Sequence, residues 1–145
     1  MRAGQVFSDW SNFVRAIGRD RRNGLDANAL SEKYSGASIR WTGTIRKNQI
    51  QDQYAPGIQM DMPRVEVSLG GGRKLVADYV FLNVSSTGKT SWTTVSAHME
   101  VQFKARIRTA ASLFLPVNVE TFPGDSEEVL TLALEQALPI ETVTD

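Results

Sequence analysis

Two stretches of the chain alternate between apolar and polar residues. In residues 99–109 the apolar positions are Met99, Val101, Phe103, Ala105 and Ile107. In residues 38–47 the positions of the same parity are Ile39, Trp41, Gly43 and Ile45. Because successive side chains leave a strand on opposite faces, this period of two predicts two half-buried strands. Gly43 has no side chain to pack, so we expect the strand to bend or bulge there.

Three more strands are expected, over residues 58–69, 75–84 and 113–119. In the first of them the apolar positions change from even to odd numbers at Pro63, which predicts a bulge or a break. The glycines at 70–72 then predict a hairpin turn. The stretch 75–84 is apolar on both faces, so we expect a terminal helix to cover its outer side.

Helical periodicity is found at both ends of the chain. Near the N-terminus, apolar residues recur at spacings of three and four: Phe7, Trp10, Phe13, Val14 and Ile17. They predict an amphipathic helix, followed by a shorter one between Asp26 and Gly36. Near the C-terminus, Asp125 and Glu128 have the spacing of a capping box. The apolar residues that follow predict a third helix, ending before Pro139, with a wide surface to bury.

These elements predict a single, mainly β domain over residues 1–145. Residues 1–36 are expected to form a segment of two helices, and residues 37–122 a five-stranded β-barrel with one helical turn around Trp92. Residues 123–145 are expected to form the C-terminal helix and a tail. A chain of this length can bury an ordinary core without disulfides.

Two segments resemble the OB-fold. They are SEKYSGASIRWTGTI at residues 31–45 and SWTTVSAHMEVQFKARI at residues 91–107. Both are similar to the small bacterial domains likened to the tRNA-anticodon-binding OB-fold, and the similarity spans residues 30–120. The resemblance implies a closed five-stranded barrel and leaves the ligand open. Two departures are Ala97-His98, where a glycine is expected, and a very short turn at residues 110–112 in place of a ligand-contacting loop.

The composition removes several kinds of site. The 16 basic and 16 acidic residues cancel, which counts against a strongly basic nucleic-acid binder unless the charges are segregated. With no cysteine and one histidine, the chain has no thiol nucleophile, disulfide, thiolate metal site or multi-histidine site. We therefore expect neither a metal nor a cofactor. No apolar run is long enough to span a membrane, so we expect a cytoplasmic protein, with a periplasmic one after leader removal as the alternative.

Short motifs give no support to catalysis. Residues 87–90, TGKT, match the end of a phosphate-binding loop, but Asn83 stands where that motif needs glycine, so a polar loop is expected. Residues 70–74, GGGRK, fit a flexible hairpin turn better than an anion cradle. His98 has no carboxylate or nucleophile near it in the expected fold. We expect no catalytic residue and no enzymatic activity.

Basic residues on two expected strands form the candidate ligand site. Arg40 and Arg46 on the first strand and Lys104, Arg106 and Arg108 on the fourth are expected to face outward as one stripe. Lys47 and Tyr54, in the polar loop 47–57, complete the set. Trp41, Phe103 and Tyr79 have the inward parity, which leaves Tyr54 as the exposed ring on which a base can stack.

Two function classes follow from these patterns. The apolar terminal helices and the doubly apolar third strand favour a binding or assembly module that contacts a protein partner or a second copy of itself. The alternative is a single-stranded nucleic-acid binder that uses the basic stripe. A module for a small molecule or a sugar is compatible with the polar loop but has no residue in its favour.

Overall fold

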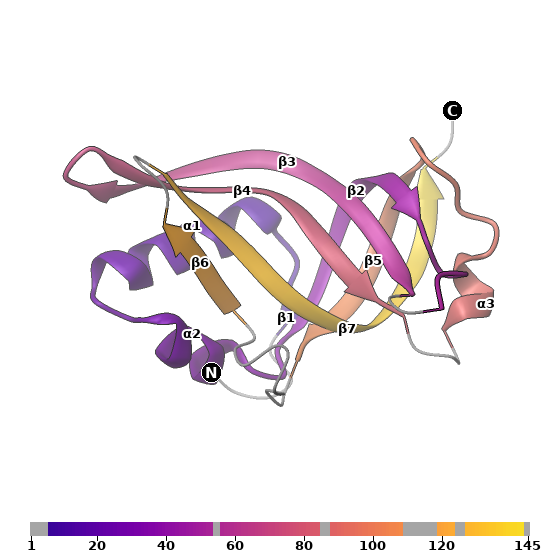
Figure 1. Ribbon diagram of the computed structural model, residues 1–145, viewed down its shortest axis with the longest axis horizontal. Helices are drawn as coiled ribbons and strands as arrows, with labels where there is room; N and C mark the ends of the chain where they lie inside the picture. The colour runs from indigo at the N-terminus through magenta and orange to yellow at the C-terminus, as the bar shows by residue number, and fades with distance from the viewer. Residues whose placement is uncertain (1–5, 54–55, 85–87, 109–118, 124–126, 144–145) are drawn as a thin grey trace.

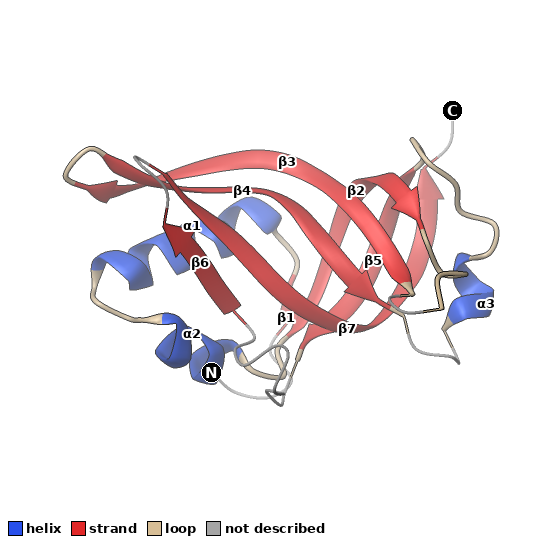
Figure 2. Ribbon diagram, viewed as in Figure 1, coloured by secondary structure: helices blue, strands red, loops and turns tan. Residues whose placement is uncertain are grey.

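The computed structural model describes residues 6–53, 56–84, 88–108, 119–123 and 127–143 (Figure 1). Within these residues the protein is mainly β, with one seven-stranded sheet and a few helices (Figure 2). The helices are α1 (Trp10–Arg22), α2 (Ala27–Tyr34) and α3 (Lys89–Trp92). The strands are β1 (Val6–Phe7), β2 (Ser38–Asn48), β3 (Gly57–Gly70), β4 (Arg73–Asn83), β5 (Glu100–Ile107), β6 (Val119–Pro123) and β7 (Glu127–Val143).

Five of the strands pair in a ring. β2 pairs with β3, β3 with β4, β4 with β7, β7 with β5, and β5 again with β2. The β4–β7 pair is parallel and the other four are antiparallel. Trp41 of β2 lies opposite Phe103 of β5, and both side chains are buried. The two alternating stretches are thus confirmed as neighbouring strands with a common apolar side.

β3 changes its partners around Pro63. The β3–β4 register shifts between Asp61 and Val65, which confirms the irregularity predicted there. Before the shift β3 pairs with both β2 and β4, and after it β3 pairs with β4 alone. The β3–β4 hairpin turns at residues 70–72, where all three glycines have positive φ. Glycine adopts this conformation without strain, so the predicted turn is confirmed.

Part of the sheet extends beyond the ring and is covered by the two N-terminal helices. The second half of β3, the first half of β7 and β6 belong to this extension (Figure 1). α1 packs on β3 and α2 packs on β6. Ser31 of α2 joins the edge of β6, because its hydroxyl donates to the Val119 carbonyl and accepts from the Val119 amide. The two helices predicted near the N-terminus are therefore confirmed, but Phe7, expected among the apolar residues of the first, lies in β1, which pairs with β2.

The predicted C-terminal helix is wrong, because residues 127–143 form the strand β7. From Glu128 to Leu134 the even-numbered residues are buried, while Val129 and Thr131 between them are exposed. Glu128 is no helix cap: its carboxylate accepts two hydrogen bonds from the Arg21 guanidinium, at 2.9 and 3.1 Å. Asp125 lies outside the described residues, as does most of the expected strand 113–119. β7 takes the place of that strand in the ring, and no C-terminal helix covers β4 in the described structure.

Aromatic side chains fill both ends of the ring. At one end Trp10 and Phe13 of α1 pack on Trp41, with ring centroids 4.9 and 5.2 Å apart. At the other end α3 confirms the predicted helical turn, and its Trp92 is fully buried. The Trp92 indole donates a 2.9 Å hydrogen bond to the Ala137 carbonyl of β7. Helices and strands therefore share one continuous hydrophobic core.

Candidate binding surfaces

The expected basic stripe is divided into separate groups. Arg40, Lys104 and Arg106 gather on one side of the β2–β5 pair, around a shared hollow. Arg46 and Lys47 line a different hollow near the end of β2. Arg108 is half-buried beyond the end of β5, where its amide donates to the Ala133 carbonyl. Tyr54 lies outside the described residues.

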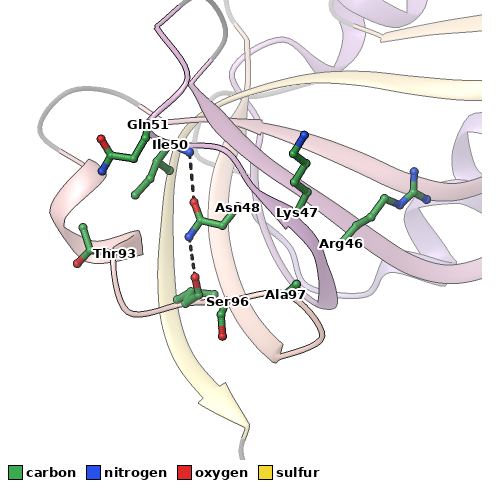
Figure 3. Close-up of a pocket in the computed structure, with 9 residues that line it drawn as sticks. Arg46, Lys47, Asn48, Ile50, Gln51, Thr93, Ser96 and Ala97 are labelled. Carbon is green, nitrogen blue, oxygen red and sulfur yellow. Dashed lines mark hydrogen bonds between the residues drawn. The ribbon is translucent and has the colours of Figure 1, made fainter.

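The hollow beside Lys47, called the loop hollow below, has a volume of about 480 Å³ (Figure 3). Arg46 and Lys47 lie on one side of it, and Gln51 and Thr93 lie on the other. Asn48 fixes its shape, since its amide nitrogen donates to the carbonyls of Trp92 and Val95 and its oxygen accepts from the Ile50 amide. The polar lining can hydrogen-bond a ligand, and Lys47 has no ion-pair partner in the described part of the chain.

A pair of half-buried aromatic rings lies on the outer side of β4. Tyr79 and Phe81 stand opposite Asp61 and Gln59 of β3, and the four residues are called the ring face below. The positions between them, Val80 opposite Met60, are buried in the core. The expectation that Tyr79 points inward is therefore wrong. Near Pro63 the core-facing residues of β3 change from even-numbered to odd-numbered ones, and a matching change occurs along β4. The sequence of β4 does not show where that change takes place.

The ring face and the loop hollow are connected through Arg46. Its guanidinium lies over the Tyr79 ring, 4.5 Å from the centroid, and pairs with Asp61. The hydrogen bond to Asp61 raises the pKa of Arg46, and partial burial raises the pKa of Tyr79. At neutral pH this face therefore presents a cation, a balancing carboxylate and two neutral rings. The Gln59 side chain also donates to Gln49 at the start of the loop.

The second hollow, called the β2–β5 hollow below, has a volume of about 400 Å³. Its charged lining residues are Arg40, Lys104 and Arg106, and β7 contributes Gln136 and Leu138. Arg40 lies directly opposite Lys104 in the antiparallel register. None of its described lining residues is aromatic, so this hollow offers positive charge without a surface for stacking.

Several charges on β3, β4 and β7 form ion pairs with one another. Arg64 contacts Glu66, Asp78 and Glu127, and Lys74 contacts Glu66 and Glu127. These exposed pairs neutralise one another and stabilise the fold little. Lys74 belongs to the GGGRK turn, whose role as a simple hairpin fits this pairing.

His98, the one histidine of the chain, lies shortly before β5. His98 is exposed, with a φ of 73°, and its amide donates to the Ile45 carbonyl. Among the residues that the structure describes, no three His, Asp or Glu side chains are grouped to hold a metal ion. Within the same residues, none of the helices has the length and apolar composition that crossing a bilayer demands.

Comparison of the chain with protein-family models, with curated proteins and with solved structures yields no match. The geometry of the two hollows and of the ring face must therefore carry any functional argument.

Proposed function

We propose that the protein is a non-enzymatic, OB-type binding module that takes single-stranded nucleic acid on the ring face and in the loop hollow. The OB-type proposal is supported by the order of pairing in the ring, β2–β3–β4–β7–β5, and by its single parallel pair β4–β7. A short helix, α3, stands between the third and fourth strands of the ring, as in OB-folds. In that fold the surface of the second and third strands and the adjoining loop bind oligonucleotides.

The observation that carries the nucleic-acid proposal is the pair of outward rings, Tyr79 and Phe81, beside Arg46 and Lys47. Single-strand binders combine aromatic surfaces for the bases with cations for the backbone, and stacking contributes about 1–3 kcal/mol per base. Each ring is partly exposed. The sequence pattern alone indicates only Tyr54 as an exposed ring.

The modest number of cations sets the expected salt dependence. Arg46 and Lys47 can neutralise two phosphates at most, and Arg46 is already paired with Asp61. For single strands the slope of log K against log salt is about −0.7 per neutralised phosphate, so a slope no steeper than about −1.4 is expected. Stacking, which is insensitive to salt, then supplies most of the affinity.

The test is fluorescence anisotropy of a labelled thymidine oligonucleotide at low and moderate salt. Replacing Phe81→Leu keeps an apolar side chain but removes the ring, and should weaken binding by about 5- to 150-fold, the equivalent of one stacked base. Lys47→Gln should flatten the salt slope by about 0.7. Arg19→Gln, on the exposed side of α1, serves as the matched control.

Two results would contradict the proposal. One is the absence of binding at low salt by a wild-type protein whose melting transition shows it to be folded. The other is equal affinity of wild type and Phe81→Leu, which would remove the ring face from the site even if some binding remained.

The alternative is assembly through protein contacts. β7 carries the two exposed large hydrophobic residues of the described structure, Val129 at 45% and Ile140 at 39% exposure. They lie near opposite ends of β7 and are the residues of this strand that an apolar partner could cover. The apolar residues that first motivated it, on α1 and in residues 128–138, are instead largely buried in the core of a single chain.

A further inference from the structure

The β2–β5 hollow brings like charges together without neutralising them. Ile39 and Ala105 are buried, so the alternate positions Arg40 and Lys104 lie on the outer side of the two strands. There Arg40 and Lys104 are directly opposite one another in the register. Like charges at such positions destabilise an antiparallel pair, which a purely structural surface would avoid by placing opposite charges.

Neither of these two cations has a carboxylate partner in the described part of the chain. Ion pairs there include those of Arg21, Lys33, Arg46, Arg64 and Lys74, and none joins Arg40 or Lys104 to a described carboxylate. Glu135 of β7 is the register partner of Arg106, not of Arg40 or Lys104. The uncompensated positive charge is therefore concentrated where β2 faces β5.

A third cation and part of β7 complete the hollow. The Nε of Arg106 is buried and has no hydrogen-bond acceptor among the residues that the structure describes. An unsatisfied donor of this kind is unfavourable, and a ligand oxygen can satisfy it. Gln136 has a φ of 56°, and it lies where the β5–β7 register shifts between Lys104 and Arg106. At this local departure from regular pairing Gln136 lines the same hollow.

We propose that the β2–β5 hollow binds a phosphate group, with Arg40, Lys104 and Arg106 as its ligands. Guanidinium groups bind phosphate oxygens with two parallel hydrogen bonds, and lysine adds a compact positive charge. The described residues that line the hollow include no aromatic ring, so it recognises the phosphate and not a base. This site shares no residue with the ring face or the loop hollow, and it does not depend on the function proposed above.

Isothermal titration with inorganic pyrophosphate at low ionic strength tests the site. Wild type should bind, and Arg40→Gln and Lys104→Gln should each weaken binding at least tenfold, because each removes one charge-assisted interaction. Arg15→Gln, an exposed arginine on α1, should leave the affinity unchanged. Equal weakening by Arg15→Gln would show that pyrophosphate responds to net charge and not to this hollow.

The melting temperature gives a second readout, which does not require a measurable heat of binding. Without ligand, Lys104→Gln should melt at the same or a higher temperature than wild type, because a like-charge contact is removed. Pyrophosphate should raise the melting temperature of wild type but not that of Arg40→Gln or Lys104→Gln. The proposal is overturned if wild type shows no shift and no titration signal, or if the two variants retain the full shift. The oligonucleotide experiment with Phe81→Leu is unaffected by either outcome.

Discussion

Asp20 is a buried carboxylate, and its partners connect α1 to α2. The phenolic hydroxyl of Tyr34 donates to it at 2.6 Å, and Lys33 donates to both of its oxygens. Burial and the hydrogen bond to Asp20 raise the pKa of Tyr34 well above its ordinary value. In the folded protein the phenol therefore keeps its proton at pH values where an exposed tyrosine loses it.

This pKa shift predicts a loss of stability at alkaline pH. Above pH about 10 the unfolded chain releases the Tyr34 proton while the folded protein retains it, so the free energy of unfolding falls by up to about 1.4 kcal/mol per pH unit. Below that pH the group contributes no pH dependence. In Tyr34→Phe the decline should be shallower, although the variant is less stable at pH 7 because Asp20 loses a hydrogen bond. Urea unfolding of both proteins between pH 8 and 11 checks this, and parallel declines would contradict it.

At the residue scale the sequence predicts burial well where a strand is regular and poorly where its parity changes. Trp41 and Phe103 lie in strands whose mutual register has no shift, and both are buried as the alternation indicates. Tyr79 follows the irregularity between Asp61 and Val65 on the neighbouring strand and faces outward. The alternation of apolar and polar residues within β4 does not show the register shift against β3. The outward orientation of Tyr79 and Phe81 therefore could not be predicted from the sequence.

At the scale of elements, β2 has a glycine at the point where atoms of the paired strand β3 lie very close to it. A Cβ on Gly43 would lie 2.6 Å from Cγ of Met60 and 2.9 Å from the Asp61 carbonyl oxygen. The β2–β5 register runs through Gly43 without a shift, and the irregularity in β2 comes later, between Ile45 and Lys47. The register therefore shows no bulge at Gly43, one of the two irregularities expected there, and the close approach of β3 is the reason for the glycine.

The change Gly43→Ala should destabilise the protein by about 1–3 kcal/mol, because the added methyl group has no room between β2 and β3. Thr42→Ala, at the adjacent exposed position of the same strand, is the control and should change stability by no more than about 0.5 kcal/mol. Guanidinium unfolding measures both. If the Gly43→Ala protein is as stable as wild type, the neighbouring residues of β3 can move aside at no cost and the prediction is wrong.

β7 shows why an element can be assigned to the wrong class. Its apolar residues fit a helical surface, and the capping-box spacing of Asp125 and Glu128 favoured that interpretation. Leu130, Leu132 and Leu134 nevertheless alternate with period two, which was the available signal for a strand. Gln136, with positive φ, then breaks the alternation and moves burial to Ala137. A single backbone irregularity therefore hid the strand pattern within a longer apolar stretch.

At the scale of the whole molecule, the zero net charge conceals segregated patches. The sequence identifies Arg40, Lys104 and Arg106 as outward cations of neighbouring strands, and the structure brings them to one hollow. It also separates Arg46 and Lys47 from them, because β2 pairs with β5 along its first half and with β3 along its second. Only the pairing of distant strands decides which charges meet, so composition alone cannot predict a binding surface.

Whether the protein self-associates can be tested by measuring its mass in solution. If β7 is an assembly surface, light scattering should give an apparent mass that rises above 16.0 kDa with concentration. The double change Val129→Ser and Ile140→Ser should then restore the monomer, because it removes the exposed apolar residues of that strand. Thr131→Ala, exposed between them, is the matched control. A mass independent of concentration in the wild type removes this alternative.

The position of β7 along the chain constrains how a nascent copy matures. Residues 127–143 supply partners to β4, β5 and β6 at once, and every one of those strands precedes them in synthesis order. A ribosome-bound chain that has emerged only as far as β6 therefore has unpaired backbone groups along one edge of β4, β5 and β6. It also exposes the apolar side chains that Leu130, Leu132 and Leu134 later cover. The ring can therefore close only after residues 127–143 have been translated, and until then the unpaired edges of these strands are open to pairing with other chains.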